Sequence, residues 1–300
     1  MKKLGLIASV LVLGAVGCTP DTKNSERKLD EMQKDIRDIK ASLAALQKGG
    51  MGAGAAQRPQ RAEPDRSKTY AVPVDGSPAW GNADAKVTLV KAYDYACPYC
   101  EKVRPTMNDL KAKYGNDLRI VYKQLVVHPR NAMASALAFC AANEQGGIER
   151  AKKFDEYLWD KGFKARQLDN SDVAPAAEKG GGGGGGGKCW DQAGGCAIVV
   201  GFAQEAGLNV DKFKADMKGK CLQLVQKDMG ELQRLAVGAT PSFFVNGRFI
   251  SGAMPMENFS TLIDEELKKA NERIQQGTPA ADYYNQWVIQ KGLKTVERPQ

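Results

Sequence analysis

Two cysteines stand two residues apart where a β-rich run gives way to a helical pattern, in the segment Cys97-Pro-Tyr-Cys100. The run before them, Val87–Tyr93, is rich in Val, Leu and Thr. After them, apolar residues recur at helical spacing from Pro98 to Tyr114, and Gly115 ends the pattern. A second β-rich run covers Leu118–Val127. A strand, a helix and a strand within about 40 residues predict a βαβ unit with two parallel strands.

A cysteine at this junction has a chemical advantage. The unpaired N–H groups and the dipole at a helix N-terminus stabilise a thiolate, so we expect Cys97 to be the nucleophile and Cys100 the resolving thiol. Lys102 and Arg104 add positive charge nearby. Asp94, three residues before Cys97, is a candidate for tuning the thiol pKa or moving a proton, but it also fits a turn or helix-start residue.

Zinc binding is the main alternative use of a Cys-x-x-Cys pair. A structural zinc site needs four ligands, commonly from a second such pair or from histidines. The chain has one Cys-x-x-Cys, and its single histidine, His128, follows the second β run, where it is expected to cap or pack a helix near Ala132. We therefore expect no metal.

A second motif, Gly238-Ala-Thr240-Pro241, lies directly before a predicted hairpin. The hairpin consists of Ser242–Val245, the Asn246-Gly247 turn and Arg248–Ser251. A cis peptide bond at Thr240–Pro241 would expose the backbone of Thr240 to an extended substrate peptide and present that peptide to Cys97. The alternative is a trans proline in an ordinary turn.

Together these motifs resemble the DsbA/thioredoxin-like family over roughly residues 70–273. The resemblance rests on Cys97-Pro-Tyr-Cys100, on Thr240-Pro-Ser-Phe-Phe-Val-Asn-Gly247 and on the segment from Tyr70 to Ala85. It implies an α/β thioredoxin-like fold with an inserted helical subdomain, and a Cys97/Cys100 redox pair that needs no other cofactor. It also implies a substrate site formed by Thr240, Pro241, Pro98 and Tyr99.

Details of the motifs refine this resemblance. Pro105 stands eight residues after Cys97, the offset at which thioredoxins kink the active-site helix. The Pro-Tyr dipeptide differs from the Pro-His of the strongly oxidising periplasmic enzyme, which predicts a less extreme potential. Thr240 before the proline is shared with periplasmic isomerases.

The first 17 residues have the pattern of a secretory signal, with Lys2 and Lys3 before an apolar run from Leu4 to Val16. Gly17 and Cys18 then resemble a bacterial lipoprotein site, in which Cys18 carries the lipid. An ordinary signal peptide is the alternative. We expect an anchor on the periplasmic side of a bacterial membrane, and the outer membrane if the cell has two.

The chain has seven cysteines, which suits an exported protein. Cys140, Cys189, Cys196 and Cys221 remain after Cys18 and the redox pair. We favour the disulfides Cys189–Cys196 and Cys140–Cys221, with free buried thiols as the alternative.

Residues 18–48 contain a heptad pattern, which predicts a coiled-coil-like helix and a homo-oligomer through residues 25–48, or else a solvated spacer. Its apolar positions are Leu29, Met32, Ile36, Ile39, Leu43 and Leu46. Residues 49–69 read as a flexible linker and 70–274 as the thioredoxin-like domain. Within that domain we expect a helical insertion at about 128–236 and a disordered glycine run at 180–187. Residues 275–300 form a C-terminal tail that either packs against the domain or extends from it without contacts.

The formal charge of +8 comes from 43 basic and 35 acidic residues that are interspersed, which argues against a nucleic-acid partner. No apolar stretch after the signal is long enough to span a membrane. We expect an oxidase of unfolded or reduced exported proteins, reoxidised by a membrane quinone-linked partner. A disulfide isomerase or reductase, and a non-catalytic lipoprotein scaffold, remain the alternatives.

Overall fold

The computed structural model describes residues 33, 34, 36, 37, 40, 63–172 and 187–296. The chain divides into two compact units, Met1–Gln60 and Arg61–Gln300. The described residues of the first unit are helical and exposed, and Ile36 has an exposed fraction of 49%. The predicted signal segment, Cys18, the other heptad positions and residues 49–62 of the predicted linker lie outside the described residues.

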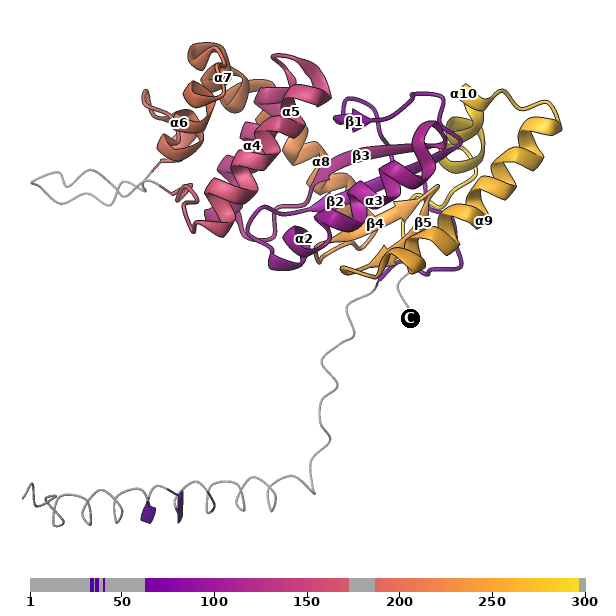
Figure 1. Cartoon of the computed structure of the whole chain (residues 1–300), viewed down its shortest axis with the longest axis horizontal. Helices are drawn as coiled ribbons and strands as arrows, with labels where there is room; N and C mark the ends of the chain where they lie inside the picture. The colour runs from indigo at the N-terminus through magenta and orange to yellow at the C-terminus, as the bar shows by residue number, and fades with distance from the viewer. Residues whose placement is uncertain (1–32, 35, 38–39, 41–62, 173–186, 297–300) are drawn as a thin grey trace, which may run out of the picture. The chain divides into compact units, whose positions relative to one another are not determined.

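The second unit is built on a five-stranded sheet in the order β1-β3-β2-β4-β5 (Figure 1). Strands β2 and β3 are parallel, and the other neighbours are antiparallel. The predicted βαβ unit is therefore confirmed. The strands are β1 (Ala79–Trp80), β2 (Val87–Tyr93), β3 (Leu118–Gln124), β4 (Ser242–Val245) and β5 (Arg248–Ser251).

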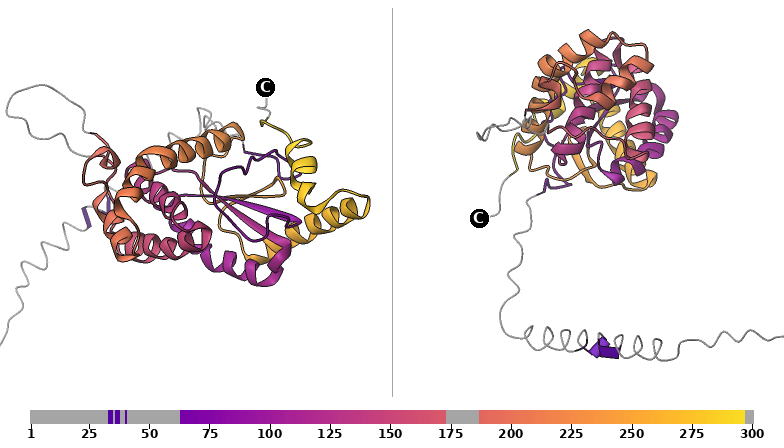
Figure 2. Two further views of the ribbon diagram at one scale, coloured as in Figure 1. Left: turned by 90° about the horizontal axis from the view of Figure 1, so that it is seen from above. Right: turned by 90° about the vertical axis from the view of Figure 1, so that its left-hand side faces the viewer.

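Helices cover both faces of this sheet (Figure 2), so β2 is buried along its whole length. Side chains of a strand alternate between faces. Leu89 and Tyr93 share a core with α3 (Arg104–Tyr114) and α9 (Met256–Gln275). Val90 and Ala92 belong to a second core with α8 (Leu222–Arg234). Burial on both faces explains why this strand is a nearly continuous apolar run in the sequence.

The predicted helical insertion lies between β3 and β4. It consists of α4 (Pro129–Asn143), α5 (Gly147–Glu156), η2 (Tyr157–Lys164), η3 (Cys189–Asp191), α6 (Ala197–Glu205), α7 (Val210–Asp216), η4 (Met217–Cys221) and α8. The disulfide Cys140–Cys221 joins α4 to η4, and Cys189–Cys196 joins η3 to the start of α6. Both pairs are those favoured from the sequence. Of the glycine run, only Gly187 is among the described residues.

The helix predicted from Pro98 to Tyr114 is divided into α2 (Pro98–Lys102) and α3. Val103 separates the two, and Pro105 occupies one of the first positions of α3. Proline has no N–H group to donate to the carbonyl four residues earlier, so the helical ladder is interrupted here.

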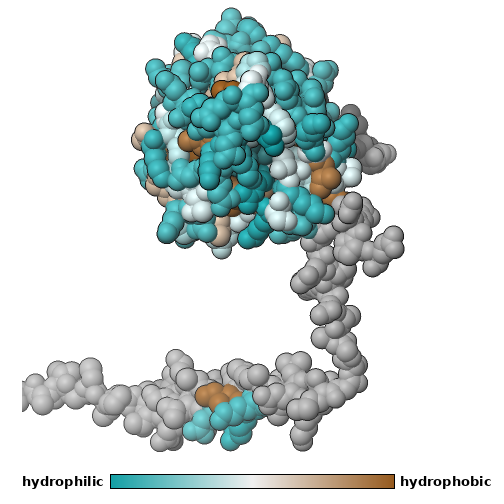
Figure 3. All heavy atoms as spheres, turned by 90° about the vertical axis from the view of Figure 1, so that its right-hand side faces the viewer, coloured by the Kyte–Doolittle hydropathy of each residue, from teal (hydrophilic) through white to brown (hydrophobic). Residues whose placement is uncertain are grey.

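The tail docks on the domain through α10 (Ala280–Tyr283) and η5 (Tyr284–Ile289), which the sequence pattern left open. Tyr283 is buried, and the Tyr284 hydroxyl donates to the Val72 carbonyl oxygen at 2.8 Å. The face that carries α9 and α10 is mostly hydrophilic (Figure 3). None of the helices within the described ranges has the length and apolar content needed to cross a bilayer.

The two disulfides close loops of very different length, with sequence separations of 81 and 7 residues. Loop-closure entropy grows with the logarithm of loop length. Replacing Cys140 and Cys221 by alanine should therefore lower the free energy of unfolding by about 2 kcal/mol more than the Cys189→Ala/Cys196→Ala pair does. Urea unfolding of both double variants measures this difference, and equal losses would contradict the prediction.

Candidate active site

Strand β2 ends at Tyr93. Four residues later, Cys97 directly precedes helix α2, which begins at Pro98. Cys97 is the N-cap residue with an extended backbone, and Pro98 follows at the first helical position. The Cys97 carbonyl oxygen accepts hydrogen bonds from the N–H groups of Cys100 at 3.1 Å and Glu101 at 3.3 Å. The first cysteine therefore lies at the helix N-terminus and the second lies one turn inside the helix, which explains the spacing of the motif.

The pairing of β2 with β4 brings the second motif to the same place. Ala92 pairs with Ser242, so the start of β4 lies beside the end of β2. The peptide bond between Thr240 and Pro241 is cis. The Cys97 Sγ atom lies 3.3 Å from the Thr240 carbonyl oxygen, to which it donates a hydrogen bond when the thiol is protonated. Two motifs 143 residues apart in the sequence thus form one site.

The two cysteines are free thiols and both are buried, with exposed fractions of 4% for Cys97 and 0% for Cys100, but their pKa values are shifted in opposite directions. The pKa of Cys97 is lowered to about 5, chiefly by the hydrogen bond from the Cys100 side chain, while burial opposes this effect. The Thr240 side chain and the N–H groups of Cys100 and Tyr99 lower the pKa further. For Cys100, burial and its hydrogen bond to Cys97 raise the pKa far above the ordinary value. At neutral pH the site therefore holds one thiolate and one thiol.

Pro98 and Tyr99 lie between the cysteines and face solvent, and Tyr99 has an exposed fraction of 61%. Thr240 is partly exposed and Pro241 is buried. Of the four residues that the sequence assigned to substrate binding, Pro98 and Tyr99 follow Cys97 directly, Thr240 contacts its sulfur, and Pro241 follows Thr240.

Asp94 is fully buried and ties the loop before Cys97 to the loop after β3. One carboxylate oxygen accepts from the Ala96 N–H at 2.6 Å, and the other accepts from the N–H groups of Val127 at 2.7 Å and His128 at 2.8 Å. These contacts favour the turn role of Asp94. His128 is the N-cap residue of α4, and its side chain makes no capping hydrogen bond.

The basic residues after the motif make other contacts. Arg104 pairs with Asp160 at 3.2 Å and lies over the Trp159 ring at 5.7 Å. Lys102 is exposed. Neither is among the groups that lower the pKa of Cys97.

Two charged residues, Lys91 and Asp155, lie near the cysteines in the structure but were not identified from the sequence. Lys91 in β2 is buried, and its charge favours the thiolate form of Cys100. Asp155 in α5 accepts hydrogen bonds from the Tyr95 hydroxyl at 2.6 Å and from the Trp159 indole N–H at 3.0 Å. The available signal was the lysine itself, which interrupts the otherwise apolar end of the Val87–Tyr93 run.

Across the described parts of both units, no three side chains of His, Cys, Asp or Glu are grouped so that they could hold a metal ion. The chemistry that this geometry offers directly is that of the Cys97 and Cys100 sulfur atoms.

Comparison with known proteins agrees with this geometry. The family model described as thioredoxin (Thioredoxin_4) matches residues 74–265. BdbD from Bacillus subtilis superposes with a TM-score of 0.53 at 19% identity, covering 69% of this chain and 100% of that chain. For α-DsbA1 from Wolbachia pipientis the TM-score is 0.51 at 15% identity, covering 68% and 96%. These likenesses confirm the α/β thioredoxin-like fold with a helical insertion.

A Na(+)/H(+) antiporter NhaA from Herminiimonas arsenicoxydans is 28% identical over 185 residues, which are 61% of this chain and 24% of the antiporter. The chain thus spans about a quarter of the length of the curated relatives it matches.

The lowered pKa of Cys97 predicts how the reduced protein reacts with iodoacetamide. Because the thiolate is the attacking species, the rate should rise through a midpoint near pH 5 and be flat between about pH 7 and 8, where an ordinary thiol is still titrating. Mass spectrometry of the labelled protein measures the rate at each pH.

Two variants serve as controls for this titration. Cys100→Ala removes the strongest stabilising hydrogen bond, so the midpoint should rise by about one pH unit or more. Cys97→Ser leaves Cys100, which should stay unlabelled at neutral pH. A wild-type midpoint near that of a free thiol would refute the assignment of Cys97 as the stabilised thiolate.

Proposed function

Because the chain belongs to the thioredoxin family, we propose that it is an exported thiol–disulfide oxidoreductase that forms disulfides in client proteins through Cys97 and Cys100. The observation that carries this proposal is the contrast between two adjacent sulfur atoms. Cys97 lies against the Thr240 carbonyl oxygen with a pKa of about 5, while Cys100 is fully buried with a raised pKa.

The reaction starts from the oxidised pair. A client thiolate attacks the Cys97 sulfur, a mixed disulfide forms, and the bond to Cys100 breaks. The Cys100 sulfur takes up a proton, as its raised pKa favours. A second client thiolate then attacks the client sulfur of the mixed disulfide and releases Cys97 as a thiolate. Two electrons pass from the client dithiol to the enzyme, and the client keeps the disulfide.

The low pKa of Cys97 favours this direction. A thiol of lower pKa leaves faster, so the second step is accelerated. Stabilising the thiolate also stabilises the reduced enzyme, which makes the oxidised enzyme a better disulfide donor.

Thr240 and Pro241 hold the client. The bend before β4 turns the backbone of Thr240 towards Cys97. An extended client segment that pairs with this backbone would place its own sulfur next to Cys97, in the manner of a strand added at a sheet edge. Pro98 and the exposed ring of Tyr99 form the opposite side of this binding site.

The proposal includes a location and partners. Residues 1–17 direct export, and a lipid on Cys18 anchors the protein on the periplasmic side of the membrane. Unfolded or reduced exported proteins are the clients, and a membrane quinone-linked partner reoxidises Cys97 and Cys100. The heptad pattern at residues 25–48 supports a homo-oligomer, which sizing of the protein with and without these residues tests.

A disulfide isomerase or reductase is the second candidate, favoured by Thr240 and by the heptad pattern. The redox equilibrium with glutathione separates the two. A potential near that of glutaredoxins, about −200 to −230 mV, indicates the isomerase or reductase, whereas a value closer to about −120 mV indicates the oxidase. A non-catalytic scaffold would show no thiol–disulfide exchange that depends on Cys97.

The decisive experiment follows disulfide formation in a reduced peptide with two cysteines, using stoichiometric oxidised protein. We expect transfer by the wild type and none by Cys97→Ser, because the attacked sulfur is missing. Cys100→Ser cannot form the enzyme disulfide, so it is instead given the peptide in its disulfide form. Its Cys97 thiolate should attack that disulfide, release one peptide thiolate and remain bound as a mixed disulfide, which non-reducing electrophoresis detects. The Cys189→Ala/Cys196→Ala pair is the matched control and should retain transfer. Transfer by Cys97→Ser at the wild-type rate would overturn the proposal.

A further inference from the structure

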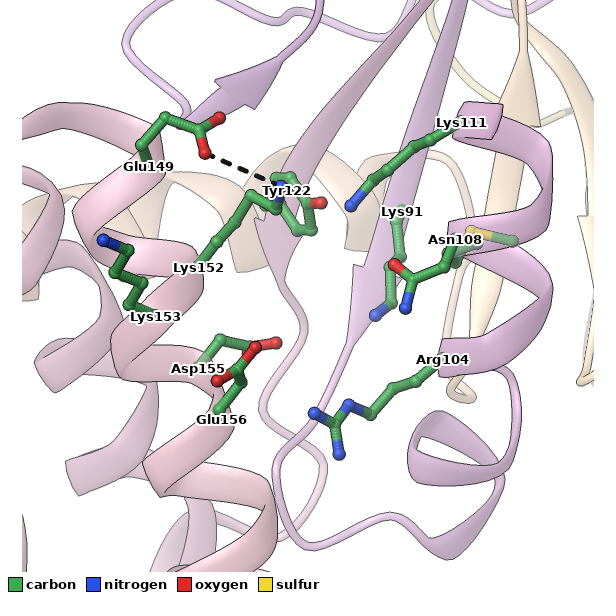
Figure 4. A pocket seen from close by; sticks show the side chains of 11 residues that line it. Lys91, Arg104, Asn108, Lys111, Tyr122, Glu149, Lys152, Lys153, Asp155 and Glu156 are labelled. Atoms are coloured by element: carbon green, nitrogen blue, oxygen red, sulfur yellow. Dashed lines mark ion pairs between the residues drawn. The ribbon is translucent and has the colours of Figure 1, made fainter. Parts of the chain in front are cut away.

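A cavity of about 260 Å³ lies between helices α3 and α5, with β2 and β3 behind it (Figure 4). Its charged lining is predominantly basic. Five of the side chains are cationic and three are carboxylates. The cations are Lys91, Arg104, Lys111, Lys152 and Lys153, and the carboxylates are Glu149, Asp155 and Glu156.

Lys91 is the unusual member of this set. Its side chain lies in the middle of a buried strand, with an exposed fraction of 4%, and it lines the cavity. Its ammonium group lies 4.5 Å from the centre of the Tyr93 ring and 6.0 Å from that of Tyr122. Within residues 63–172 and 187–296 it forms no hydrogen bond or ion pair. An ammonium group that is buried without a hydrogen-bonded partner is costly. Burial lowers the pKa of Lys91, and the charge of Asp155 opposes this effect without cancelling it.

A second buried lysine of the same sheet is paired with carboxylates, as buried lysines usually are. Lys123 in β3 is fully buried and binds two carboxylates, Asp228 at 2.6 Å and Glu231 at 2.7 Å. The fold therefore neutralises one buried lysine and leaves the charge of Lys91 facing a cavity.

Two further lysines, Lys111 and Lys152, line the same cavity as Lys91. Lys111 lies over the rings of Trp80 at 5.2 Å and Tyr122 at 5.9 Å. The Lys152 ammonium group lies 5.7 Å from the centre of the same Trp80 ring. Burial, Lys152 and Lys91, in that order, lower the pKa of Lys111 to about 8. Lys111 is therefore close enough to Lys152 and to Lys91 to be repelled by both, and an anion bound in the cavity would relieve that repulsion.

The carboxylates at the cavity offset this positive charge only in part. The charge of Asp155 raises the pKa of Lys91 and of Lys111, and that of Glu149 raises the pKa of Lys111, but burial outweighs these effects. Asp155 is held by the Tyr95 hydroxyl and the Trp159 indole N–H. Glu149 lies 3.9 Å from Lys152, the edge of ion-pair distance. Among the described residues, Glu156 contacts none of the three lysines as an ion pair. Arg104 is bound to Asp160, so it adds little free positive charge.

We propose that Lys91, Lys111 and Lys152 bind a small divalent oxyanion of the phosphate or sulfate class in this cavity. Lysine binds such groups as a point charge, and partial desolvation strengthens the attraction. Figure 4 shows Lys111, Asn108 and Arg104 extending from α3 towards α5, so the Asn108 amide lies where it can donate to the same anion.

Titration calorimetry of the intact reduced protein with inorganic phosphate at pH 7 and constant ionic strength tests this site. We expect saturable binding of one phosphate, competition by sulfate and none by acetate at equal ionic strength. Lys111→Gln and Lys152→Gln should each weaken binding by about tenfold, since each removes a charged donor. Lys111→Arg, which keeps the charge, should retain most of the affinity.

Lys113→Gln is the matched control, because Lys113 lies on the same helix and pairs with Asp264 at 3.8 Å outside the cavity. It should leave the affinity unchanged. Cys97→Ser should also bind phosphate normally, so failure of the redox function does not imply failure of the anion site. A merely linear, non-saturating response to phosphate, or equal losses for Lys111→Gln and Lys113→Gln, would overturn the proposal.

Discussion

The antiparallel pairing of β2 with β4 is the constraint on which the site depends. It sets Ala92 beside Ser242, so the chain that leaves β2 towards Cys97 passes the chain that enters β4 from Pro241. Neither motif is a site alone. The Cys97 sulfur lies beside the Thr240 carbonyl oxygen because the backbone hydrogen bonds between β2 and β4 fix both strands.

Asymmetry between the two cysteines follows from their places on the first helical turn. Cys97 is the N-cap residue of α2 and receives hydrogen bonds at this N-terminus. Cys100 lies one turn further into the helix, where its side chain is fully buried. The same spacing that allows the sulfurs to meet therefore gives them different acidities. Asp94 supports this arrangement indirectly, because it holds the loops before α2 and after β3 together through three backbone N–H groups.

The parts of the fold that could be predicted are those encoded by short-range patterns. The strands Val87–Tyr93, Ser242–Val245 and Arg248–Ser251 follow directly from apolar and β-branched runs. The second β run continues to Val127 in the sequence, but β3 ends at Gln124, and Asp94 takes the N–H group of Val127. That contact spans 33 residues, so no local pattern contains it. The same holds for the cavity that Lys91, Lys111 and Lys152 line together, which depends on how α3 and α5 pack over the sheet.

The Cys140–Cys221 disulfide closes a covalent ring around most of the helical insertion, including the glycine run. A protease that cleaved a single peptide bond between these two cysteines would leave fragments that remain joined through sulfur. Strands β2, β3, β4 and β5 lie outside the ring, so their connection to one another would persist. While this disulfide is intact, a single cut would therefore not separate the strands that hold the two cysteines of the motif from those that follow Pro241, and that protection would end on reduction.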